Sequence, residues 1–182
     1  MKGLYLALFV VSVCIASCNS VGKCYYMDSI TGDDGNNGNS PSQAWKSIER
    51  LNSVEFKPGD RIYFKSGTEY VGNFHPKGSG TPENPIVVDK FGKGENPILN
   101  GDGKELYTIL LDGNVHWRLA NLEIVNKGKE FVPGRKGIWI HVEKNEDAYH
   151  VVLHKLTIRD VVGDLEGEMP GGGIHVSSER DS

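Results

Sequence analysis

The sequence predicts an all-β solenoid, a β-helix in which short strands stack coil upon coil. The main observation is an internal repeat: HWRLANLEIVN at residues 116–126 returns as HVVLHKLTIRD at residues 150–160. Each copy is followed by the pattern Gly-Ile-x-(Ile/Val), at residues 137–140 and again at 173–176. Such repeats bury their apolar faces only by stacking on their neighbours. Both copies alternate apolar and polar residues without a helical period, which favours stacked strands over a helical array.

The segments before the repeat fit the same architecture. Residues 31–41 are dense in turn formers and predict a loop. Residues 42–52 carry apolar side chains at helical spacing, with Ser40 or Ser42 as N-cap, and predict one short capping helix. This helix would cover the N-terminal end of the stack, which otherwise exposes an open core. Strands are expected at residues 25–28, 61–65, 70–75, 86–90, 97–100 and 106–111.

Alternate strand residues should point inward and stack on their equivalents in the next coil, about 4.8 Å away. Asn126 and Asp160 occupy matching positions after the strands, where such side chains satisfy turn amides. Residues 173–176 begin a fresh strand, so we expect the solenoid at residues 25–182 to be truncated at its C-terminal end. The expected inward pairs are Trp117 or Val151, Leu119 or Leu153, Leu122 or Leu156, and Ile124 or Ile158.

The N-terminus predicts a targeting segment. Lys2 precedes an apolar run at residues 3–16, which is short for a membrane span. The run ends in Ile-Ala-Ser-Cys at residues 15–18, which resembles the bacterial lipobox. We therefore expect a lipoprotein signal peptide at residues 1–17, a lipidated Cys18 beginning a polar tether at residues 18–24, and an extracytoplasmic place in the bacterial cell envelope. The alternative is ordinary secretion, after which a retained Cys18 could pair with Cys24.

Charge and motifs narrow the classes of partner. The formal net charge is −4 and the chain has no Lys/Arg cluster, which argues against a nucleic-acid partner. A polysaccharide remains compatible, because it can be neutral or can contact local basic residues. The chain also has no Gly-x-Ser-x-Gly elbow, phosphate loop or dinucleotide fingerprint.

Several short motifs occur in a characteristic order. They are YYMD at residues 25–28, GDD at 32–34, AWKSI at 44–48, FKPGDRI at 56–62, HPKGSGT at 75–81, NPIVV at 84–88, LEI at 122–124 and GIWI at 137–140. Together they resemble the opening of bacterial right-handed parallel β-helix lipoproteins of the pectate-lyase-like superfamily. The resemblance implies a right-handed parallel β-helix that processes polysaccharides, as a lyase or a glycoside hydrolase, with most catalytic residues on later coils. A non-catalytic glycan-binding or structural lipoprotein would share the same opening.

Trp139 and His175 are the candidate carbohydrate-binding residues. Each occupies the third position of its Gly-Ile-x-(Ile/Val) copy, between two inward residues, so both should point outward one coil apart. An exposed aromatic ring beside an imidazole can hold the apolar face of a sugar ring. The alternative is that Trp139 packs under the neighbouring loop at residues 127–136.

A cluster of acids follows the second repeat copy, before the glycine-rich residues 169–173. By the same resemblance, β-helix lyases use a carboxylate-held Ca²⁺ and an Arg or Lys base. This makes Arg159 or Lys155 a candidate base, and Asp160 beside them a further catalytic candidate. Oxygen ligands suit Ca²⁺, so Asp164 and Glu166, with Glu168, are candidate ligands. The alternative is a solvated loop that holds no metal.

Overall fold

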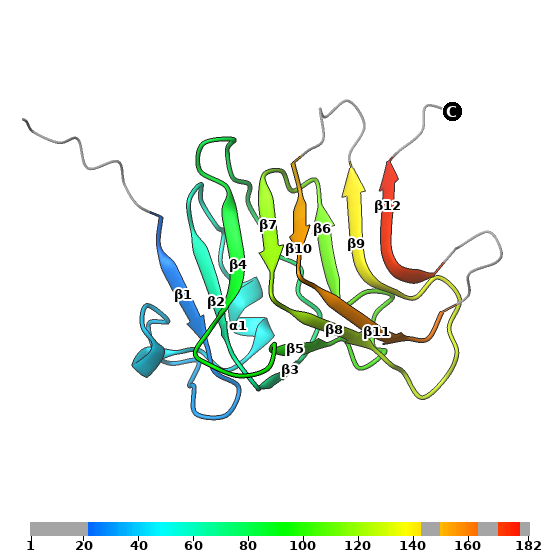
Figure 1. The fold of residues 1–182 in the computed structure, drawn as a ribbon, viewed down its shortest axis with the longest axis horizontal. Helices are drawn as coiled ribbons and strands as arrows, with labels where there is room; N and C mark the ends of the chain where they lie inside the picture. The colour runs from blue at the N-terminus through cyan, green and yellow to red at the C-terminus, as the bar shows by residue number, and fades with distance from the viewer. Residues whose placement is uncertain (1–21, 143–149, 164–170, 179–182) are drawn as a thin grey trace, which may run out of the picture.

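The chain has an all-β fold of parallel sheets with almost no helix (Figure 1). A computed structural model describes residues 22–142, 150–163 and 171–178. Helical structure in this part of the chain is limited to the 3-10 turn Pro41–Gln43 and the helix α1, Ile48–Asn52. None of the described helices is long and apolar enough to cross a membrane.

Three parallel sheets contain all the described strands. From β4 onward the chain visits the three sheets in turn, so strands that pair within one sheet come from successive passes. The first sheet has the order β1 (Cys24–Met27), β2 (Arg61–Lys65), β4 (Ile86–Phe91), β7 (Trp117–Ala120) and β10 (Val152–His154). The second has β3 (Glu69–Val71), β5 (Ile98–Asn100), β8 (Glu123–Asn126) and β11 (Thr157–Val161). The third has β6 (Ile109–Asp112), β9 (Lys136–Val142) and β12 (Gly172–Ser178).

The core lies between the sheets and is formed by every second strand residue. In β2, for example, Ile62 and Phe64 are fully buried, whereas Arg61, the first residue of the strand, is exposed. Trp117 is the largest fully buried side chain, and its indole N–H donates to the Gly78 carbonyl at 3.0 Å. This period of two is the one that the sequence pattern predicts.

The two repeat copies pair in the register that the sequence predicts. Leu119 lies opposite Leu153, Ile124 opposite Ile158, and Ile138 opposite Ile174. The inward residues of both copies contact the core, but they are not equally buried. The inward residues of the first copy are fully buried, whereas Leu153, Leu156 and Ile158 are half-buried.

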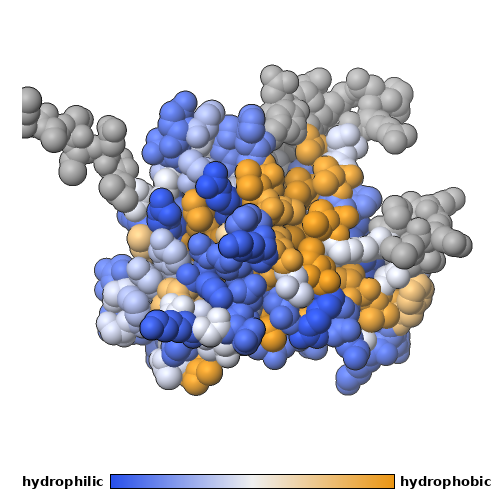
Figure 2. All heavy atoms as spheres, viewed as in Figure 1, coloured by the Kyte–Doolittle hydropathy of each residue, from blue (hydrophilic) through white to orange (hydrophobic). Residues whose placement is uncertain are grey.

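Position in the stack explains this difference. β10, β11 and β12 are the outermost strands of their sheets, so within the described residues no further strand covers them. Ile174 is therefore 50% exposed, although its counterpart Ile138 is fully buried. Figure 2 shows the resulting apolar surface over the region that Figure 1 labels β10 and β11, where Val152 is also exposed.

The helix is shorter than predicted and begins later. Ser47 is its N-cap, accepting a hydrogen bond from the Arg50 amide at 3.0 Å, in place of Ser40 or Ser42. The cause is Trp45, whose amide donates to the Tyr26 carbonyl and whose backbone bridges Met27, so that this stretch extends the edge of the first sheet. Backbone paired in this way cannot enter a helix.

The expected equivalence of Asn126 and Asp160 is also wrong. The register shifts after Arg159, so that Val161 pairs with Asn126 and Asp160 is left in a bulge with a φ of 53°. Asn126 is fully buried and donates to the Lys136 carbonyl at 2.9 Å, whereas Asp160 is exposed. Only the first of the two side chains therefore ties a turn together.

Candidate functional site

The outer face of the third sheet carries the predicted pair Trp139 and His175. Trp139 on β9 lies opposite Leu110 on β6 and His175 on β12. Because strand residues alternate, the residues two positions further on share this face. They are Asp112, His141 and Ser177, with His141 opposite both others. We call these six residues the β9 face.

Three contacts hold the Trp139 side chain. Its indole N–H donates to the Ser177 hydroxyl at 2.8 Å. The Lys136 ammonium lies 4.7 Å from a ring centroid of the indole, a cation–π distance. The His175 ring lies 6.3 Å away at an interplanar angle of 71°, so the two rings meet edge to face. In the alternative interpretation residues 127–136 cover Trp139. Of that segment, Lys136 contacts the indole.

Aromatic rings extend from Trp139 across the neighbouring coils. The Tyr107 ring lies 6.4 Å from Trp139, and the His75 ring lies 6.2 Å from Tyr107. On the other side of Trp139, the His141 ring lies at 6.0 Å. A cavity of about 120 Å³ opens among Leu110, Asp112, Trp139 and His141. The arrangement combines apolar ring surface with several hydrogen-bonding groups.

The charges around this face are set by burial. Burial lowers the pKa of Lys136, whose ammonium donates to the Gly134 carbonyl at 2.6 Å. Burial lowers the pKa of His175 as well, and the charge of Lys136 lowers it further. His175 is therefore neutral at pH 7, and a neutral imidazole both donates and accepts hydrogen bonds, as a sugar hydroxyl requires. Burial, followed by the charges of Glu105 and Asp112, raises the pKa of Tyr107, which keeps its hydroxyl protonated.

Arg159 and Asp160 lie on a different sheet from the β9 face. The Arg159 guanidinium donates to Glu123 and to Asp160, each at 2.6 Å. The hydrogen bond to Glu123, and then that to Asp160, raises the pKa of Arg159. A general base must lose its proton, so this pairing offers no support for the predicted base role. Lys155, the other candidate base, is exposed at a corner with a φ of 51°.

The remaining predicted site residues lie outside the described part of the chain. They are Cys18, Asp164, Glu166 and Glu168. Within the described ranges, no group of three or more His, Cys, Asp or Glu residues could hold a metal ion. The roles of these residues in lipidation, catalysis and Ca²⁺ binding remain predictions.

Six members of this neighbourhood were not predicted from the sequence pattern: Lys136, Tyr107, Leu110, Asp112, His141 and Ser177. The signal for the last two was present, because they stand two residues after Trp139 and His175 and so share their side of the strand. Tyr107 precedes its strand, and its approach to Trp139 depends on the turn before β6, which has no repeat partner to reveal it.

No protein-family model matches the chain. A native crystal structure of a GH136 lacto-N-biosidase from Eubacterium ramulus superposes on 86% of this chain with a TM-score of 0.79 and 27% sequence identity. Its selenomethionine derivative gives a TM-score of 0.77 and 28% identity over the same share. This chain is similar to lacto-N-biosidases. The lacto-N-biosidase of Bifidobacterium longum subsp. longum is 31% identical over 94 residues, which cover 48% of this chain.

The chain spans only part of each lacto-N-biosidase. It covers 30% of the Eubacterium ramulus protein in the solved structures and 6% of the Bifidobacterium longum protein. The matched part of the solved structures shares the all-β arrangement described above.

Proposed function

We propose that this chain is part of a glycoside hydrolase that acts on oligosaccharides carrying a lacto-N-biose unit, and that the β9 face binds the saccharide. The similarity to lacto-N-biosidases supports the substrate class, because it extends over most of this chain in both fold and sequence. It also favours a hydrolase over a lyase. The observation that supports saccharide binding is local: an indole held by a hydrogen bond lies beside polar side chains on the outside of a sheet.

The architecture that we propose is a right-handed parallel β-helix. The support is the order of strands: from β4 onward each pass of the chain adds one strand to each of the three sheets, and paired strands are parallel. In such a coil the outward residues of successive passes form ladders. The ladder Leu110–Trp139–His175 is then a continuous strip on which a saccharide can extend over several coils.

The chemistry of hydrolysis needs more than the described residues of this face provide. Glycoside hydrolases of the common type place two carboxylates on either side of the scissile bond. Among the described residues, Asp112 is the one carboxylate that lines the β9 cavity. We therefore propose that this face binds the saccharide and that a second carboxylate comes from outside the described residues. The same observation favours a second candidate function, a non-catalytic glycan-binding protein.

The test is an assay of the protein with an oligosaccharide that ends in lacto-N-biose, measuring release of lacto-N-biose and binding separately. Release that is lost in Asp112→Asn supports the hydrolase. Binding without release supports the glycan-binding alternative. Neither binding nor release contradicts both functions. The matched control is Asp102→Asn, which removes an exposed carboxylate from a turn remote from the cavity.

We also propose that the protein is extracytoplasmic and held in the bacterial cell envelope by lipid on Cys18. The support is the Ile-Ala-Ser-Cys sequence after an apolar run. Cys18→Ser should move the protein from the membrane fraction to the soluble fraction, and mass spectrometry should find the lipid on the N-terminal cysteine. Cys24→Ser is the matched control and should stay with the membrane. An unmodified N-terminus at another residue would contradict the anchor.

A further inference from the structure

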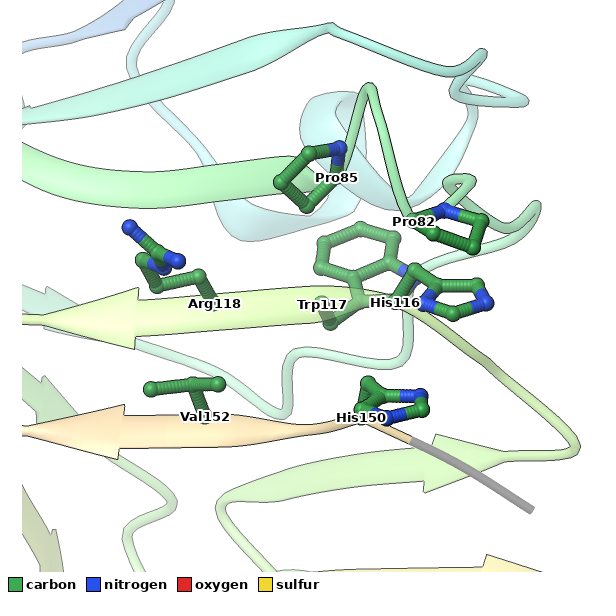
Figure 3. A pocket seen from close by; sticks show the side chains of 7 residues that line it. All are labelled: Pro82, Pro85, His116, Trp117, Arg118, His150 and Val152. Carbon is green, nitrogen blue, oxygen red and sulfur yellow. The ribbon is translucent and has the colours of Figure 1, made fainter.

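A second hollow lies on the first sheet, away from the β9 face. Figure 3 shows it between the loop before β4 and the strands β7 and β10. Its volume is about 200 Å³. This is below the roughly 300–1,000 Å³ of sites that hold drug-sized ligands, so it suits one small unit. It is lined by Pro82, Pro85, His116, Trp117, Arg118, His150 and Val152.

Two stacked histidines form one end of this groove. The His116 and His150 rings have centroids 5.1 Å apart and an interplanar angle of 7°. They hold the same position in the two repeat copies, and both have left-handed backbones, with φ of 56° and 57°. That conformation costs an L-residue roughly 1–2 kcal/mol. In Figure 3 the His116 ring lies beside Pro82, whereas Pro85 lies farther along the groove, near Trp117.

A cation stands at the other end of the groove. Arg118 on β7 lies opposite Val87 on β4 and Val152 on β10, so apolar side chains flank it in its ladder. The side chain is exposed, and within the described residues no carboxylate forms an ion pair with it. A guanidinium carries the fork of donors that fits a carboxylate.

We propose that this groove binds a single carboxylate-bearing sugar residue. The Arg118 guanidinium takes the carboxylate, and the imidazole nitrogens of His116 and His150 exchange hydrogen bonds with ring hydroxyls. The apolar rims of Pro85 and Val152 pack against the C–H face of the sugar. The site is independent of the proposed function, because it shares no residue with the β9 face.

The test is a titration of the whole chain followed by NMR. The ligand is glucuronate, and the two controls are glucose, a neutral sugar, and acetate, a carboxylate without the sugar ring. We expect glucuronate to bind and to shift the imidazole signals of His116 and His150, with those of His75 and His141 unchanged. Glucose and acetate should each bind about tenfold more weakly, because each lacks one half of the recognised group. Arg118→Gln should weaken glucuronate binding by a similar factor. Arg61→Gln, an exposed arginine that also pairs with Val87, should not.

Three results would overturn the proposal. Equal affinity for glucose and glucuronate would remove the role of the carboxylate. Equal affinity for acetate and glucuronate would leave an anion site without sugar recognition. Unchanged binding in Arg118→Gln would place the carboxylate elsewhere. Because Arg118 is exposed, the Arg118→Gln variant should fold. Val152→Glu provides a second variant, which sets a negative charge beside the guanidinium and should also weaken glucuronate binding.

Discussion

The Lys136 ammonium lies 4.7 Å from the centroid of a Trp139 ring, on the face of the sheet where His175 meets the same indole edge-on. A buried cation thus fixes the orientation of an aromatic side chain and also acts on an imidazole. Lys136 is only 5% exposed, so water screens its charge poorly. The ionisation of His175 should report directly on this arrangement.

We predict that Lys136→Met raises the pKa of His175. Burial lowers this pKa first and the charge of Lys136 lowers it further, so removal of the charge relieves the second cause. NMR titration of the imidazole signals measures the change. Lys155→Met, which removes an exposed charge from a corner of the fold, should leave the His175 pKa unchanged. An unaltered His175 pKa in Lys136→Met would contradict the contact.

Leu119 and Leu153, which pair in register, should contribute unequally to the free energy of unfolding. Leu119→Ala should lower the free energy of unfolding by about 2–5 kcal/mol, because it opens a cavity in a fully buried layer. Leu153→Ala should cost roughly half as much, since the half-buried site lets neighbours and water fill the space. Urea unfolding of both variants measures the difference. Equal losses would show that the last described coil is as well covered as the one before it.

Asp28 should make the protein sensitive to acid. Burial alone would raise its pKa, but hydrogen bonds from Lys65 and from Thr31 and Ile30 outweigh burial and lower the pKa to about 2. The Lys65 ammonium lies 2.6 Å from the carboxylate, whose side chain is 4% exposed. A lowered pKa in the folded state stabilises the fold above the unfolded-state value near 4, and this contribution of roughly 2 kcal/mol is lost as the pH falls from about 4 through 2.

The measurement is the free energy of unfolding between pH 2 and pH 7 for the wild type and Asp28→Asn. The stability difference between them should shrink as the pH falls below about 4. Asp33→Asn, which removes an exposed carboxylate from the same loop, is the matched control. A constant difference for Asp28→Asn across this range would contradict the lowered pKa.

Arg135 should hold three turns together. Its side chain is buried, and its guanidinium donates to the carbonyls of Gly103, Glu130 and Val162 at 2.9–3.2 Å. Arg135→Met leaves these acceptors without their donor and should cost about 2–4 kcal/mol of unfolding free energy. Arg61→Met, at an exposed strand position, should change it by well under 1 kcal/mol. A small effect of Arg135→Met would show that water or other donors replace the guanidinium.

The sequence was sufficient to predict the strands and their registers where the period of two was uninterrupted. β2 has the predicted bounds, and Trp139 lies opposite His175 as expected, because repeated side chains in stacked strands must pair. The start of the helix was not predictable from apolar spacing, since Trp45 pairs with the first strand through its backbone. The contact of Lys136 with Trp139 also leaves no trace in the repeat, because the residue that pairs with Lys136 in the next strand is Gly172.

The bulge at Asp160 was also not predictable from the repeat. One extra residue before Val161 breaks the structural correspondence between the two copies. The two sequences align without a gap at this position, so the alignment does not indicate the extra residue. The stacked pair His116 and His150 was visible as the first letter of each copy. Its significance depended on the left-handed backbone that brings the two rings together, which the residue type does not indicate.

The most direct test of the central claim is a calorimetric titration of the protein with lacto-N-biose, comparing the wild type with Trp139→Ala and Tyr63→Ala. Tyr63 is a matched control, because it presents an aromatic ring on the first sheet, stacked on Tyr26 and remote from the β9 face. We expect binding by the wild type and by Tyr63→Ala, and an affinity at least about tenfold weaker in Trp139→Ala. Wild-type affinity in Trp139→Ala, or loss of binding in Tyr63→Ala instead, would contradict it.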